Sequence, residues 1–183
     1  MQSEVLIQSL IEQTRQHLNQ AAQLNELNID ELNWRENQDS WSVLECLEHL
    51  NLYGDYYLPE MEKEIGKAKK MSAPVFSSGM LGGYFAKMML PKEKLNKMKT
   101  FKDKNPIHTH LDRTVIDRFT RQQHRLLDLL NRSREVDLSH VRVTTSISRL
   151  IRLKLGDTFA FYINHIVRHL RQVERVQAAM TKG

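Results

Sequence analysis

Residues 41–50 read Trp41-Ser42-Val43-Leu44-Glu45-Cys46-Leu47-Glu48-His49-Leu50. Ser42 followed by Glu45 three positions later is a capping box, in which each side chain bonds the backbone N–H of the other residue. The apolar residues that follow recur at steps of three and four, the period of an amphipathic helix. The stretch therefore predicts the start of a long helix whose apolar face is Val43, Leu47, Leu50, Gly54 and Tyr57. We expect Pro59 to lie near a kink or at the end of the regular part of this helix.

Three further stretches have the same helical period. They run from Ser3 to Leu27, from Leu111 to Ser133 and from Gly156 to Met180. Amphipathic helices bury their apolar faces against one another, so the sequence predicts an all-α four-helix bundle. Residues 1–183 are expected to form a single domain of this kind. The β-branched residues between Val141 and Leu155 have no second strong strand to pair with, so we expect a linker there.

Residues 66–106 interrupt the pattern between the second and third long helices. This segment has 10 lysines and 2 acidic residues, a net charge of +8, whereas the whole chain carries only +5. We expect it to be a long Lys-rich crossover insertion with one short helix from Tyr84 to Leu90. No nucleic-acid motif accompanies the lysines, so a solvated loop or a channel for an anionic substrate is favoured over a nucleic-acid surface.

The cysteine count limits the classes of site. Cys46 is the only cysteine, which excludes an intramolecular disulfide and the Cys-rich zinc sites of fingers and ribbons. The N-terminal residues lack a signal-peptide pattern, and no apolar run is long enough to span a bilayer. We therefore expect a cytoplasmic protein with neither a membrane nor a nucleic acid as its partner. Any metal site must use imidazole and oxygen ligands.

Three of the 8 histidines lie where they could converge. His165 and His169 are four residues apart on the border of the apolar face of the last helix. That spacing places them about 40° apart around the helix and about 6 Å apart along it, close enough to share one ion. His49, on the border of the second helix, would complete a three-nitrogen site with an open coordination position. The alternative is that these are boundary histidines that hydrogen-bond locally.

The other histidines are expected to be ordinary polar residues. His17 is predicted to lie among polar residues of the first helix and His124 on the solvated side of the third, while the rest lie in or beside loops. Arg168 is predicted to be on the solvated face of the last helix, within reach of an anionic substrate at the rim of a pocket.

Two motifs resemble those of the DinB-like (YfiT-like) family of metal-binding four-helix bundles. Trp41–Leu50 is similar to the family's W-S-x-x-E-x-x-x-H-L opening of the second helix, and His165–Gln172 is similar to its closing H-x-x-x-H-x-x-Q. The resemblance covers the whole chain in helix order, although about twenty residues carry it. The Lys-rich insertion departs from the short connections of compact bundles and could roof the pocket.

The resemblance implies that His49, His165 and His169 are the ligands of a divalent metal ion, nickel or zinc. It also implies an enzyme that transfers a low-molecular-weight thiol to an electrophilic small molecule. The alternatives are a metal-dependent hydrolase or isomerase, or a metal- or ligand-binding module without turnover. Bundles of this type often pair through exposed helix faces, so a homodimer is expected.

Such a site could favour the thiolate form of a thiol, the nucleophilic form, without a nucleophile from the protein. Tyr53, four residues after His49, is the catalytic candidate as a general acid or hydrogen-bond donor; the alternative is a tyrosine packed in the bundle. Gln172 could orient His169 or His165. Cys46 lies near the centre of the apolar face and is expected to be a buried core thiol, so the reacting thiol would come from a cosubstrate.

Overall fold

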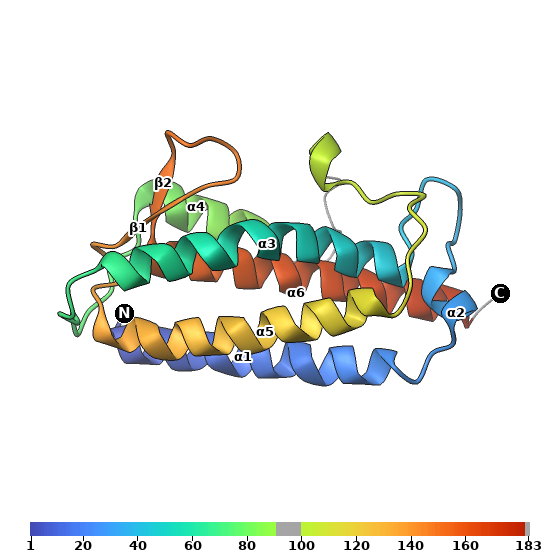
Figure 1. The fold of residues 1–183 in the computed structure, drawn as a ribbon, viewed down its shortest axis with the longest axis horizontal. Helices are drawn as coiled ribbons and strands as arrows, with labels where there is room; N and C mark the ends of the chain where they lie inside the picture. The colour runs from blue at the N-terminus through green and yellow to red at the C-terminus, as the bar shows by residue number, and fades with distance from the viewer. Residues whose placement is uncertain (91–99, 182–183) are drawn as a thin grey trace.

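The computed structural model describes residues 1–90 and 100–181 of the chain. Four long helices form a bundle, which confirms the all-α four-helix architecture (Figure 1). They are α1 (Ser3–Leu24), α3 (Val43–Lys67), α5 (Thr114–Arg132) and α6 (Leu155–Met180). Both α3 and α1 pack against α5 and α6, so the order around the bundle is α1, α5, α3, α6. None of the helices described is long and apolar enough to cross a membrane.

The directions of the helices require a long crossover. In Figure 1, α1 and α6 run one way while α3 and α5 run the other way. Because α3 and α5 are parallel, the chain between them must return along the length of the bundle. This return contains α4 (Met80–Met89), which packs against α6, and the short 3₁₀ helix η1 (Lys102–Lys104). The predicted short helix is present but begins at Met80, and residues 91–99 of the predicted insertion lie outside the described residues.

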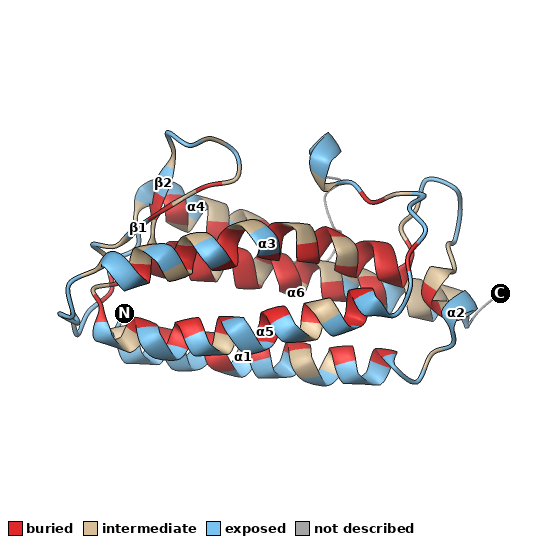
Figure 2. Ribbon diagram, viewed as in Figure 1, coloured by how far each residue is buried: buried red, intermediate tan, exposed pale blue. Residues whose placement is uncertain are grey.

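The start of α3 forms as its sequence predicts. Ser42 Oγ accepts the N–H of Glu45 at 3.2 Å, and Glu45 Oε2 accepts the N–H of Ser42 at 2.8 Å. The residues of the predicted apolar face are all buried, and Figure 2 colours buried residues along α3 red. The helix continues past Pro59 to Lys67, so the prediction that Pro59 could end its regular part is wrong. Packing on both sides of α3 outweighs the one backbone hydrogen bond that a proline removes.

Two small elements escaped prediction. The short helix α2 (Ile29–Asn33) begins at a second capping box, made by Asn28 and Glu31, in a stretch that lies beyond the first predicted helix. The expected linker after α5 contains an antiparallel hairpin, in which β1 (Arg142–Thr144) pairs with β2 (Arg152–Lys154). Each strand has only three residues, which is too short for a recognisable period of two. The linker therefore pairs with itself, and no separate strand is needed.

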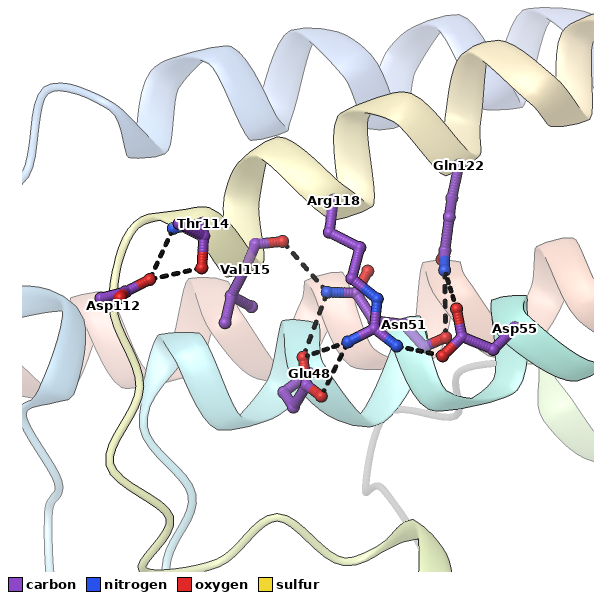
Figure 3. A network of polar contacts seen from close by, with 8 residues as sticks. All are labelled: Glu48, Asn51, Asp55, Asp112, Thr114, Val115, Arg118 and Gln122. Carbon is purple, nitrogen blue, oxygen red and sulfur yellow. Dashed lines mark hydrogen bonds and ion pairs between the residues drawn. The ribbon is translucent and has the colours of Figure 1, made fainter.

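Polar contacts set the register between α3 and α5 (Figure 3). Arg118 donates to Glu48 at 3.0 Å, and Gln122 Nε2 donates to the backbone carbonyl of Asn51 at 3.1 Å. A Cβ atom at Gly54 would lie 2.0 Å from Gln122 Oε1 and 2.8 Å from the Tyr162 hydroxyl, so a larger residue here would displace the Gln122 amide from its contacts with α3. These contacts hold the part of α3 that follows His49 at a defined height along the bundle.

Candidate metal centre

Helices α3 and α6 bring three imidazoles together. His49 Nε2 lies 3.2 Å from His165 Nε2, and one nitrogen from each of His49, His165 and His169 lies within 4.8 Å of the others. Two nitrogen ligands that are each 2.0–2.1 Å from one ion are separated by about 2.8–3.4 Å when the angle at the ion is between right and tetrahedral. The separation of the His49 and His165 nitrogens falls in this range, and the three imidazoles form a group that can hold one metal ion.

In two of the imidazoles, the Nδ1 atom has a hydrogen-bond partner. His49 Nδ1 lies 2.6 Å from the backbone carbonyl of Lys104, and His169 Nδ1 lies 3.0 Å from Gln172 Oε1. Because both partners are oxygen acceptors, each Nδ1 carries the proton and each Nε2 keeps its lone pair for a ligand bond. His165 differs, since its Nδ1 is buried and has no hydrogen-bond partner among the described residues.

Burial keeps all three imidazoles neutral at pH 7. Desolvation lowers the pKa of His49 to about 4, and desolvation together with the neighbouring His49 lowers the pKa of His169 to about 3. The pKa of His165 lies well below its usual value, because the ring is desolvated and the other two histidines disfavour a further charge. Neutral imidazole is the form that binds metals, so the donor set fits a divalent ion.

Aromatic rings surround the imidazoles. The ring of Trp41 stacks on His169 with centroids 5.7 Å apart and also lies 4.8 Å from the ring of His49. The ring of Tyr53 lies 4.6 Å from His165 and 5.0 Å from His49, and burial raises the pKa of its hydroxyl to about 12. Tyr53 therefore keeps its proton at neutral pH and is available as a donor.

A buried carboxylate supports the loop that carries the Lys104 carbonyl. Glu45 is fully buried, and its Oε1 accepts the backbone N–H of His108 at 2.6 Å and the guanidinium of Arg35 at 2.7 Å. His108 has a positive φ of 62°, a strained conformation for a residue with a side chain. The first turn of α3 thus both begins the helix and holds the segment that orients His49.

The three imidazoles line a cavity of about 810 Å³, within the size range of small-molecule sites. Phe85, Met88 and Met89 of α4 form part of its wall, and Ser146 and Ile147 of the hairpin loop form another part. Residues 100–107 contribute a third part of the wall. A metal ion held by three nitrogens here would keep a coordination position open toward this cavity.

Two sequence predictions about the surroundings of a side chain are wrong. His17 is only 2% exposed and contacts Gln123 across α1 and α5, because position 17 continues the apolar face through Leu10, Thr14 and Ala21. Arg168 is 8% exposed and lines the cavity. Its position on the helical wheel suggested solvent, but α4 covers the outer side of α6, which buries a second face. Cys46 is fully buried, as predicted, and burial raises the pKa of its thiol.

The Lys104 carbonyl and the α4 side chains of the cavity wall were not among the site residues predicted from the sequence. A backbone carbonyl 55 residues from His49 leaves no mark in residue type or spacing. The amphipathic spacing of Phe85, Met88 and Met89 within the predicted short helix was a usable signal, although it does not say which surface the helix covers.

Comparison with known proteins gives a family. Searches of curated proteins and of solved structures return no significant match to the chain. The sequence profile of the DinB superfamily, however, matches residues 10–173, a range that contains all three histidines of the cluster. With its four-helix fold and its buried imidazoles at a cavity, the chain belongs to the DinB superfamily.

Proposed function

We propose that this protein is a metal-dependent enzyme that transfers a low-molecular-weight thiol to an electrophilic small molecule. The observation that carries the proposal is the cluster of three neutral imidazoles in the wall of a cavity large enough for such substrates. His49, His165 and His169 would hold the ion. Imidazole nitrogens suit nickel and zinc, which are the metals we propose.

When bound, the divalent ion supplies Lewis acidity that favours the thiolate form of a thiol. The thiol gives its proton to solvent, its sulfur bonds to the electrophilic carbon, and the leaving group departs with the electron pair of the broken bond. The chain contributes orientation: Gln172 and the Lys104 carbonyl hold two imidazoles, and Trp41 stacks on one of them. The wall of the cavity excludes water from the thiolate.

Tyr53 is the proposed donor to the reacting group. Its side chain lines the cavity beside two of the imidazoles. Because its pKa is raised, it serves as a hydrogen-bond donor or acid and not as a base at neutral pH. Tyr53→Phe keeps the ring and removes the hydroxyl, so we expect a lower kcat with unchanged metal content.

The buried free thiol of Cys46 suits a reducing compartment, and we propose a cytoplasmic location. We also propose a homodimer that pairs through an exposed helix face. On α4, Met80 and Tyr84 are 96% and 63% exposed, which supplies apolar surface for such contact. Sedimentation of the purified chain tests the oligomeric state.

The decisive experiment has two stages. Elemental analysis of protein purified without chelators should find about one divalent ion per chain, and no stoichiometric metal would overturn the proposal. A screen of thiols against electrophiles then measures thiol consumption and the product with the new carbon–sulfur bond. Metal without activity for any pair would indicate a binding module, and product formation without thiol consumption would indicate a hydrolase or isomerase.

A further inference from the structure

Glu45 has more hydrogen-bond partners than the start of a helix requires. A capping box needs one carboxylate oxygen, and Oε2 supplies it to the N–H of Ser42. The other oxygen, Oε1, accepts the backbone N–H of His108 at 2.6 Å and the guanidinium of Arg35 at 2.7 Å. Glu45 is fully buried, and burying a carboxylate costs free energy unless such partners compensate it. Capping alone does not account for a carboxylate in this place.

Another capping box in the chain shows what a helix start needs by itself. At the start of α2, Glu31 Oε2 accepts the N–H of Asn28 at 2.7 Å, and Glu31 is partly exposed. Among the described residues, the Glu31 carboxylate has no partner outside this box. Glu45 differs because its second oxygen reaches His108, which lies 63 residues further along the chain.

The contact with His108 fixes one end of a short segment. Lys104 lies four residues before His108, and its carbonyl is 2.6 Å from His49 Nδ1. Pro106, between them, is buried and has its φ restricted by its ring, so the segment is stiff. Glu45 and His49 are themselves one turn apart on the same face of α3. The segment is therefore held at both ends by one helix.

The conformation of His108 shows that this contact has a cost. Its φ of 62° is uncommon for a residue with a side chain. Two contacts hold it there, since its N–H donates to Glu45 and its exposed ring contacts the guanidinium of Arg35. Arg35 is in turn paired with Glu45, so both contacts depend on the same carboxylate. Local strain of this kind persists only where the surroundings enforce it.

We propose that Glu45 is a positioning residue of the metal centre. Through the N–H of His108, it holds the Lys104 carbonyl against His49 Nδ1. The carbonyl keeps the proton of His49 on Nδ1 and leaves the lone pair of Nε2 for a ligand bond. This inference rests on the proposed function for the metal, but the effect of Glu45 on the His49 ring exists without an ion.

Two substitutions at position 108 test the inference from the loop. His108→Pro removes the backbone N–H and requires a φ of about −65°, so the contact with Glu45 is lost while α3 keeps its own sequence. His108→Gly is the matched variant, because it keeps the N–H and adopts a positive φ without strain. The pair decides the question even if a substitution of Glu45 itself prevents folding.

The first measurement uses chelator-treated protein. Nitrogen-15 NMR of the imidazoles reports which nitrogen of each ring carries the proton. We expect the proton of His49 to stay on Nδ1 in the wild type and in His108→Gly, and to spread over both nitrogens in His108→Pro. The ring of His169, whose Nδ1 contacts Gln172 instead, should be the same in all three proteins.

The second measurement is a competition titration with Ni²⁺ and a metal-sensitive dye. His108→Pro and Glu45→Ala should bind the ion about 10- to 100-fold more weakly than the wild type, as expected for loss of a group that orients a ligand. His108→Gly should bind it as the wild type does. Ser42→Ala is the control for Glu45→Ala, because it removes the other half of the capping box and leaves the carboxylate in place.

The inference is overturned if His108→Pro leaves the proton of His49 where the wild type has it, or if His108→Gly displaces it as fully as His108→Pro does. It is also overturned if Ser42→Ala weakens Ni²⁺ binding as much as Glu45→Ala, because the start of α3 would then set the affinity. Absence of metal from the wild type would defeat the proposed transferase, whereas the NMR comparison would still decide the role of Glu45.

Discussion

His17 and His49 lie in different halves of the bundle, and burial lowers the pKa of each to about 4. His17 faces Gln123 at 3.4 Å inside the packed core, and its Nε2 has no hydrogen-bond partner among the described residues. His49 faces His165 and His169 at the wall of a cavity. Burial and a lowered pKa are therefore insufficient for a metal ligand; convergence of several lone pairs on one accessible point is also needed.

The largest expected effect comes from removing a ligand. His169→Ala should lose the metal entirely, because the two remaining imidazoles leave the ion without a third protein ligand. His17→Ala should retain about one ion per chain. Elemental analysis of both variants, with His49→Ala and His165→Ala beside them, tests the comparison. Equal retention in all four would show that the cluster is not a metal site.

The pH dependence of stability should reveal His17 as a core group. Its folded-state pKa is about 4 against an ordinary value of 6.5, so between these values the unfolded chain takes up a proton that the folded chain does not. Stability should fall as the pH drops from 6.5 to about 4, by about 3 kcal/mol for this one group, and level off below. In His17→Leu, the free energy of unfolding should depend less steeply on pH over this range, because the contribution of His17 is absent.

Urea unfolding of chelator-treated wild type and His17→Leu at several pH values gives the measurement. The three clustered histidines have lowered pKa values too and add a slope of the same sign in both proteins. Identical slopes for the two chains would contradict the assignment of a buried neutral imidazole to His17.

Loss of an orienting partner should have a moderate effect. Gln172→Ala leaves His169 Nδ1 without the acceptor that holds its tautomer, so metal affinity should fall about 10- to 100-fold. Gln177→Ala, on the same helix, is the matched control and should bind as the wild type does. A competition titration with a metal-sensitive dye measures both, and equal affinities would remove Gln172 from the site.

The smallest effect is expected at His124, which is exposed on α5. His124→Ala should keep the metal and change the free energy of unfolding by less than about 0.5 kcal/mol. Thermal unfolding and elemental analysis on one preparation test both statements. A loss of metal here would show that a histidine outside the cluster matters.

Much of the bundle could be predicted because helical signals are local. Ser42 and Glu45 reveal the start of α3, and the buried faces of α3 and α6 follow from spacing. The prediction failed at His17 because histidine was taken as a polar residue, although position 17 continues the helical spacing of the buried residues of α1. It failed at Arg168 because the wheel assumed one buried face, whereas α4 covers a second one.

The sequence by itself determined four amphipathic helices, with histidines at facing borders of two of them. It did so because the helical period repeats every few residues and is visible in any short window. Only the tertiary structure decided which carbonyl orients His49, which helix closes the cavity and where Arg168 lies. Those contacts join residues far apart in the chain, and their partners are chosen by packing and by backbone groups that residue type does not reveal.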